Sequence, residues 1–312
     1  MTFAEPRAVA VAPPLAAGLG RRYERSLAKD AWLRFRRHKL ALVGAFVYAL
    51  LIVMTLAGPF GWTKALDEID FSAAHQFSAA HPLGSDDLGR DLLARLLWGG
   101  RISIAVGLSA MLVAITIGVT VGAVAGFFGG SIDILLSRII EVFLSVPQLP
   151  LLLVVVYLYR NTLVRALGPE IGVFVMIVGV IGCLNWMPTA RLVRAGFVTQ
   201  REREYVEAAR CLGAGPLRII KHILPNTLSP IIVAGTLSVG AAMIAESTLS
   251  FLGLGFPPDV PTWGRLLFDA QNFLTIAPTL ALFPGLMIFL AVLSINFIGD
   301  GLRDALDPRR TL

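Results

Sequence analysis

The sequence predicts an all-α membrane protein with six transmembrane helices, and three observations lead to this fold class. First, 56% of the 312 residues are hydrophobic and only 15% are charged, a balance typical of membrane proteins. Second, six long segments contain no Asp, Glu, Lys or Arg, at residues 40–60, 102–132, 142–159, 171–190, 222–245 and 270–299. Third, the segments between them differ in charge in a way that assigns each to one side of a membrane.

The length and continuity of these segments favour helices over strands. A helix needs about 20 apolar residues to cross a bilayer core, and each segment is close to that length or longer. A transmembrane strand would instead show a short alternation of apolar and polar residues. We therefore divide the chain into an N-terminal arm 1–39, a first span 40–60, an external loop 61–101, a five-helix core 102–299 with a charged insert at 191–224, and a tail 300–312.

Lysine and arginine predict which side faces the cytosol. The arm 1–39 holds nine basic residues against three acidic ones, and the stretch 188–221 holds seven against three. The loop 61–101, in contrast, holds six acidic residues and four basic ones. Because positive charge is retained inside, we expect the arm, the insert and the tail in the cytosol, with loops 61–101, 160–170 and 246–269 outside. The net charge of +6 fits cytosolic flanks near a lipid bilayer and requires no nucleic-acid partner.

The arm and the external loop each carry one further prediction. The apolar run 8–19 is short and contains Pro13-Pro14, so it is a poor signal-peptide core and we expect an uncleaved N-terminus. In the loop, residues 86–97 place five leucines on one helical stripe, with Arg90, Asp91 and Arg95 off it. This pattern predicts an amphipathic helix that lies along the outer interface before the second span.

Glycine and proline mark positions in the core where helices pack closely or bend. Gly118, Gly122 and Gly126 recur at every fourth residue, which puts them on one helix face where another backbone can approach. Glycine is also common in membrane helices for no special reason, but three in register favour close packing. Prolines occur at 147, 150, 188, 225, 230, 278 and 284, and such breaks survive in a bilayer only where neighbours satisfy the freed carbonyls.

The sequence lacks the motifs of common catalytic sites. None of its four lysines follows a glycine, so the chain has no P-loop and cannot bind ATP in that manner by itself. It has no His-Glu-x2-His metal motif and no Gly-x-Ser-x-Gly nucleophile elbow. Its two cysteines, Cys183 and Cys211, suggest neither a disulfide framework nor a metal site. We therefore predict no catalytic residue, metal site or cofactor in this chain, and we do not expect an enzyme.

Three polar residues stand out in or near the spans: Asn185, Glu246 and Asn296. A carboxylate at membrane depth is costly unless it is paired, so we expect Glu246 to face the bundle interior or the outer interface. Proton or substrate binding is one explanation for it. A structural hydrogen bond that holds the adjacent loop is the commoner one, and we favour it. All three residues are candidates for a solute path or its outer gate.

The charged insert has the pattern of a short surface helix. Residues 201–213 are rich in Glu, Arg and Ala, which favour helix, and Gly213 with Gly215-Pro216 ends it. An apolar face is formed by Tyr205, Ala208, Ala209 and Leu212, and a charged face by Glu202, Arg203, Glu207 and Arg210. A second short helix, at 217–224, is expected to lead into the fifth span. An amphipathic surface helix without a partner would show the same pattern.

The segment Glu207-Ala-Ala-x3-Gly213, followed by Ile223-Leu-Pro225, resembles the signature of permease subunits of ATP-binding-cassette (ABC) importers. Five further segments resemble the second, or C-type, permease of dipeptide and oligopeptide importers, at 81–91, 101–103, 249–255, 261–264 and 296–308. Eight residues separate Gly213 from His222, one fewer than is usual in such relatives. In a continuous helix, one residue fewer rotates all later residues by roughly 100°, which the break at Gly215-Pro216 could absorb.

The resemblance implies a type I ABC importer permease fold with cytosolic termini, in the plasma (inner) membrane of a bacterium. It also implies that the insert is a coupling helix, which docks on an ATPase subunit through Tyr205, Glu207, Ala208, Ala209, Leu212 and Gly213. The implied partners are a homologous permease, two ATP-binding subunits that hold ATP and Mg, and an external substrate-binding protein. Such relatives carry peptides, glutathione, nickel chelates or haem. The alternative is an ion-gradient-driven secondary transporter or channel.

Overall fold

The computed structural model describes residues 27–306, and every regular element in that range is a helix. The expected uncleaved N-terminus at 8–19, most of the arm 1–39 and the last part of the tail 300–312 lie outside the described residues. The helices are α1 (Leu27–Phe35), α2 (Lys39–Gly61), α3 (Leu92–Phe128), α4 (Gly130–Ser145), α5 (Gln148–Leu167), α6 (Pro169–Leu184), α7 (Met187–Gln200), α8 (Glu204–Cys211), α9 (Pro216–Phe251), α10 (Trp263–Ala270) and α11 (Thr279–Leu306). Two 3-10 turns, Phe71–Ala73 and Gln271–Phe273, complete the set.

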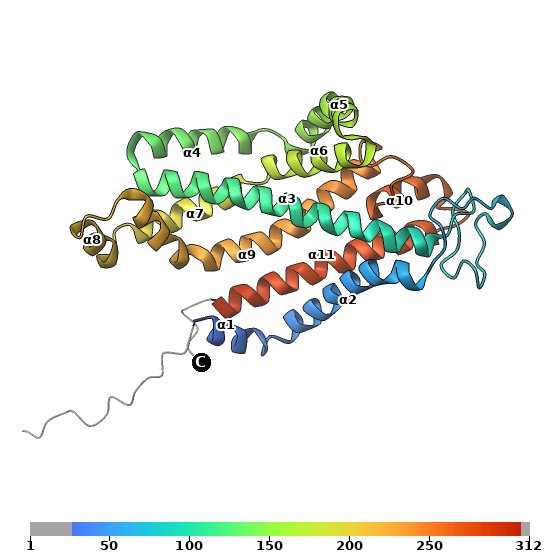
Figure 1. Cartoon of the computed structure of the whole chain (residues 1–312), viewed down its shortest axis with the longest axis horizontal. Coiled ribbons are helices and arrows are strands. Elements are labelled where there is room, and N and C mark those ends of the chain that lie inside the picture. The colour runs from blue at the N-terminus through green and yellow to red at the C-terminus, as the bar shows by residue number, and fades with distance from the viewer. Residues whose placement is uncertain (1–26, 307–312) are drawn as a thin grey trace, which may run out of the picture.

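Most of the long helices run side by side along the length of the molecule (Figure 1). Five of them, α2, α3, α5, α9 and α11, are long and apolar enough to cross a membrane. The pair α6 and α7, bent by 44° at a short break, makes a sixth span when it is counted as one. Counted in this way, the predicted six spans are confirmed.

The two ends of the bundle differ in what they carry. α8 lies at one end, together with α1 and the last turns of α11, while α10 and the loop between α2 and α3 lie at the other (Figure 1). The basic insert and both ends of the described chain therefore share one side, as the charge distribution predicts. We call this the cytosolic end and the opposite one the outer end.

The predicted amphipathic helix over 86–97 is wrong in its start and in its surroundings. α3 begins only at Leu92, where the Asp91 carboxylate caps it by accepting a hydrogen bond from the Ala94 N–H at 2.9 Å, and it continues without a break to Phe128. The leucine stripe does not lie on a lipid surface. Leu92 and Leu96 pack instead in the bundle core with Trp263. The amphipathic pattern reflects a buried helix start beneath a folded loop.

Proline positions do not by themselves predict where the helices break. The predicted span 142–159 crosses a break, because α4 ends at Ser145 and α5 begins after Pro147. The predicted separate helix 217–224 is also wrong, because α9 passes through Pro225 and Pro230 as one helix. Buried isoleucines on both sides of Pro225 share one hydrophobic cluster, and this burial offsets the cost of a proline inside the helix. These are Ile219, Ile223 and Ile231.

Two hydrophobic clusters hold the bundle together, and α3 and α9 contribute to both. One joins these helices to α2, α10 and α11 and contains Trp263, Met243 and Ile295. The other joins them to α5 and α6 and contains Ile177 and Leu249. Because α3 and α9 are central, a displacement of either would be felt through most of the transmembrane part.

Candidate functional site

The charged insert folds into α8, a short helix with defined ends. It follows Arg203, whose backbone is extended, and it stops where Gly213 adopts a φ of +77°. The Ala214 N–H donates to the Ala209 carbonyl at 3.0 Å, and the Gly213 N–H donates to the Arg210 carbonyl at 2.9 Å. This hydrogen-bonded stop is the glycine-terminated end that many helices share. Pro216 then opens α9, which separates the two helices where the sequence predicts a break.

α8 is attached to the bundle by Val206, a residue that sequence analysis missed. Val206 is fully buried and packs in one cluster with Phe197 of α7 and with Ile219 and Ile223 of α9. The predicted apolar face was centred near Tyr205, about 100° around the helix from Val206. The signal that could have identified Val206 is its character as the one β-branched residue within α8, among Ala, Glu and Arg.

The six predicted coupling residues form a surface at the cytosolic end. Glu207, Ala208 and Gly213 are exposed, and Ala209 is half-buried. Leu212 is 88% exposed, although leucine is among the residues most often found inside proteins. The Tyr205 hydroxyl donates to the Gln200 side chain at 3.2 Å and accepts from the Asn226 amide at 3.3 Å. This surface therefore leaves apolar groups uncovered while hydrogen bonds fix its orientation on α7 and α9.

Gly118, Gly122 and Gly126 of α3 lie against α7, the helix that leads into α8. A Cβ atom added at Gly122 would lie 2.5 Å from the carbonyl oxygen of Ala190, and one at Gly126 would lie 2.6 Å from the Cβ of Phe197. A Cβ at Gly118 would lie 2.7 Å from that of Thr189. Each value is shorter than real Cβ contacts allow. Hence only glycine lets the two backbones approach this closely.

Charged groups also clamp α7 at its cytosolic end. Arg194 forms a bidentate ion pair with Asp133 at the start of α4, with one nitrogen–oxygen distance of 2.7 Å. The Arg201 guanidinium donates to the Gly126 carbonyl at 3.2 Å. A planar guanidinium held at two points resists rotation better than a single contact does. These contacts tie α7 to both α3 and α4.

Glu246 of α9 is completely buried and receives hydrogen bonds from surrounding hydroxyl groups. The Ser250 hydroxyl donates at 2.8 Å and the Thr262 hydroxyl at 2.9 Å, both to the same carboxylate oxygen. Ser103 of α3 lies 3.5 Å from the other oxygen and accepts from the Trp263 N–H at 3.1 Å. The carboxylate thus joins α3 and α9 to the start of α10, and it is enclosed on all sides.

Asn185 lines a cavity of about 210 Å³ among α5, the α6–α7 break and α9. Gln148, Leu152, Ile244 and Thr248 line the same cavity. The structure does not bring Asn296 to it, because Asn296 is half-buried in α11, with its Oδ1 3.6 Å from where a Cβ on Gly240 would lie. The three polar residues predicted from sequence therefore occupy three separate places.

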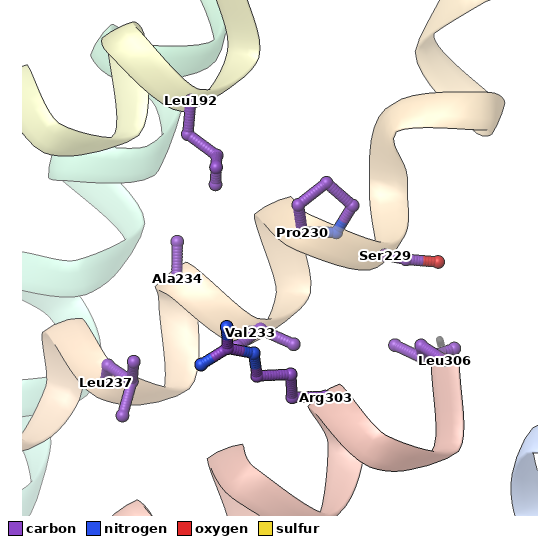
Figure 2. Close-up of a pocket in the computed structure, with 8 residues that line it drawn as sticks. All are labelled: Leu192, Ser229, Pro230, Val233, Ala234, Leu237, Arg303 and Leu306. Carbon is purple, nitrogen blue, oxygen red and sulfur yellow. The ribbon is translucent and has the colours of Figure 1, made fainter. Parts of the chain in front are cut away.

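A larger cavity of about 430 Å³ lies among α7, α9 and α11, with apolar walls and one cation (Figure 2). Leu192, Pro230 and Leu237 contribute to its walls, and the guanidinium of Arg303 reaches across toward Val233 and Ala234 (Figure 2). None of the residues predicted from sequence lines it.

The loop between α2 and α3 is a folded cap at the outer end. The Asp91 carboxylate accepts a hydrogen bond from the Trp62 indole at 2.6 Å and pairs with His81 at 3.1 Å. Buried Arg95 binds Asp86 at 2.6 Å and reaches Asp269 of α10 at 3.4 Å, so the cap is tied to α10. At the exposed edge, hydrogen bonds from the Ser72 hydroxyl and N–H lower the pKa of the Asp70 carboxyl.

No group of three or more His, Cys, Asp or Glu side chains suited to a metal occurs among residues 27–306. Both cysteines are free and exposed. The described residues form a bundle of apolar helices that contains a cavity, and α8 is attached to one end of this bundle. This is the architecture of a membrane transport subunit.

Comparisons with known proteins identify the family. The family of binding-protein-dependent transport system inner membrane components matches residues 118–312, and the N-terminal TM domain of oligopeptide transport permease C matches 26–80. The chain therefore belongs to the permease subunits of ABC importers, in the C-type branch of the dipeptide and oligopeptide family, and it has the type I ABC permease fold.

Curated relatives resemble the chain over nearly its full length. It is 39% identical to the dipeptide transport system permease protein DppC of Alkalihalophilus pseudofirmus, covering 90% of each chain. It is 37% identical to the oligopeptide transport system permease protein OppC of Haemophilus influenzae, covering 91% of this chain and 89% of that one. It is 38% identical to the glutathione transport system permease protein GsiD of Pectobacterium atrosepticum, covering 90% and 91%. These relatives are transport permeases, not enzymes.

Proposed function

We propose that this chain pairs with a homologous permease in the plasma (inner) membrane of a bacterium and forms with it a path for dipeptides, oligopeptides or a related small solute. Two ATP-binding subunits supply energy from ATP and Mg, and an external binding protein delivers the cargo. The observation that carries the proposal is the surface of α8, which is exposed at the cytosolic end and rigidly fixed to the transmembrane bundle. The names of the relatives support the cargo class.

α8 has the properties of a docking element for an ATPase subunit. Full burial of a leucine side chain contributes about 1.5–3 kcal/mol, so Leu212, exposed here, gains stability in a partner's cleft. Tyr205, Ala208 and Ala209 extend the apolar part of this surface, while Glu207 supplies a charge and Gly213 fixes its end. Because Val206 holds α8 to both α7 and α9, a push on the surface moves two transmembrane helices together.

The three polar residues have different parts in the proposed path. Asn185 lines the cavity and faces the path. Glu246 acts at the outer gate, where it holds the start of α10 against α3 and α9. Asn296 serves the contact between α9 and α11. Transport then depends on differential stabilisation of inward-open and outward-open states, with no covalent chemistry in this chain.

Reconstitution tests the proposal against its alternative. The chain, its sister permease, the ATPase subunits and the binding protein are placed in liposomes, and uptake of labelled L-alanyl-L-alanine is measured. Uptake that requires ATP and the binding protein is expected. Uptake that continues without ATP and collapses when the ion gradient is removed would instead identify a secondary transporter.

A further inference from the structure

Two breaks between consecutive helices lie close together, and one side chain beside each break meets the other. α4 and α5 are separated at Val146-Pro147, and α6 and α7 at Asn185-Trp186. The Gln148 side-chain amide donates to the Asn185 Oδ1 at 3.1 Å. Sequence analysis did not single out Gln148, although it is a polar side chain within the predicted span 142–159, as Asn185 is within 171–190.

Contacts with α3 give the depth of this meeting point. A Cβ on Gly182, just before Asn185, would touch Val113 at 2.6 Å, and a Cβ on Gly118 would lie 2.8 Å from the Trp186 carbonyl oxygen. Asn185 therefore lies at the level of α3 between Val113 and Gly118. This level is near the middle of the apolar segment 102–132. The amide pair is thus far from both membrane surfaces.

The break between α4 and α5 faces outward from this chain. Residues 141–150 are all exposed, including both non-helical residues. Non-helical backbone at membrane depth is tolerated only where protein covers it or where it lines a water-filled cavity. This face therefore borders a path or the sister permease, and lipid is excluded from it.

The hydrogen bonds of the pair fix the orientation of both amides. Asn185 donates its Nδ2 to the Ile181 carbonyl at 2.8 Å, so its Oδ1 is the acceptor for Gln148. Gln148 must then donate through Nε2, which leaves its Oε1 without a donor among the hydrogen bonds of the described residues. A carboxamide offers the same donor and acceptor as a peptide group. Gln148 thus brings a free acceptor to the cavity that it lines.

The size of the cavity fits a site shared between two chains. Its volume is about 210 Å³, whereas ordinary ligand pockets enclose roughly 300–1,000 Å³. α5 and α9 of this chain form one wall of the cavity. Because the break between α4 and α5 is exposed, the sister permease can form the opposite wall.

We propose that Gln148 and Asn185 form a binding site for peptide groups of the cargo as it crosses the middle of the membrane. The Oε1 of Gln148 accepts the N–H of a cargo peptide bond, and the amide pair exchanges its mutual hydrogen bond for bonds to the cargo. A site that recognises only the peptide main chain does not discriminate between cargo side chains, so peptides of many sequences share the path. This inference rests on the proposed peptide cargo.

The test compares a peptide with its ester analogue in the reconstituted complex. The probes are labelled L-alanyl-L-alanine and L-alanyl-L-lactate, in which oxygen replaces the peptide N–H. Their uptake ratio is measured in competition for the wild type and for Gln148→Leu. The binding protein is the same in both complexes, so its own preference cancels when the two ratios are divided. We expect the preference for the peptide to fall about five-fold in Gln148→Leu, the usual effect of one net hydrogen bond.

Two further variants make the result decisive. Gln148→Met keeps the length of the side chain and removes the acceptor, so it should lose the same preference while packing is retained. Thr120→Val changes a hydroxyl of α3 that lies outside this cavity and donates to the Thr116 carbonyl at 2.7 Å, and it should keep the wild-type preference. An unchanged preference for the peptide in both Gln148 variants overturns this inference and leaves the proposed peptide cargo standing. If the wild-type complex takes up neither probe, the proposed peptide cargo is overturned, and the inference with it.

Discussion

The contact between α3 and α7 gives a prediction whose size can be worked out from the structure. Gly122 of α3 faces the backbone of α7, and Gly122→Ala places a Cβ 2.5 Å from the Ala190 carbonyl oxygen and 2.8 Å from the Val193 Cβ. Both obstacles are parts of a helix and cannot rotate away. To restore an ordinary contact of 3.4 Å, α7 must move away from α3 by about 0.9 Å.

The expected cost combines two opposing effects. Overpacking of this kind costs about 1–3 kcal/mol, and alanine in a helix interior returns up to about 1 kcal/mol relative to glycine. We therefore expect Gly122→Ala to destabilise the protein by up to about 2 kcal/mol. Gly179→Ala is the matched control, because Gly179 also lies inside a transmembrane helix but has no atom within 4 Å of its added Cβ.

Thermal unfolding of the purified complex in one detergent checks the difference. Gly122→Ala should lower the Tm, while Gly179→Ala should leave it unchanged or raise it. Since α7 leads into α8, Gly122→Ala should also lower the amount of cargo taken up per ATP hydrolysed. Equal Tm values for the two variants would refute the claim that the glycine stripe sets the distance between α3 and α7.

Three further predictions test other parts of the molecule. Gly213→Ala should lower the free energy of unfolding by about 1 kcal/mol, because the φ of +77° at this position disfavours a side chain, and it should also lower uptake per ATP hydrolysed. Gly215→Ala, at a φ of −69°, should change neither quantity. Glu246→Leu should destabilise the protein by about 1–3 kcal/mol through orphaned hydroxyls and expose the α9–α10 loop to protease, with Glu246→Gln showing a smaller effect. Arg95→Met breaks a buried ion pair and should lower the free energy of unfolding by about 3 kcal/mol, as measured by thermal unfolding. Arg138→Met breaks an exposed ion pair and should lower it by less than about 1 kcal/mol.

The fold class and the ends of α8 could be predicted because each depends on local chemistry. Charge-free segments of sufficient length specify spans through the cost of burying charge in lipid. Gly213 ends α8 because only glycine adopts its backbone conformation easily. Pro216 begins the next helix because the first helical position needs no backbone N–H donor, which proline lacks.

The remaining features depend on contacts between distant segments, which no sequence window contains. Pro225 stays inside α9 while Pro147 marks a break, and the difference lies in the buried isoleucines around Pro225. The leucine pattern puts Asp86 at the start of an interfacial helix, yet this residue is buried against Arg90 and Arg95. Gln148 acquires its partner only when two broken helices meet.

The central claim is that energy from ATP enters this chain through the surface of α8. The most direct measurement is peptide uptake and ATP hydrolysis, in liposomes, by complexes that carry Glu207→Lys or its control Glu202→Lys. Both residues are exposed at the cytosolic end, but only Glu207 lies on α8. We predict that Glu207→Lys reaches the membrane and loses uptake while hydrolysis continues, and that Glu202→Lys transports normally. Normal uptake by Glu207→Lys would contradict the account.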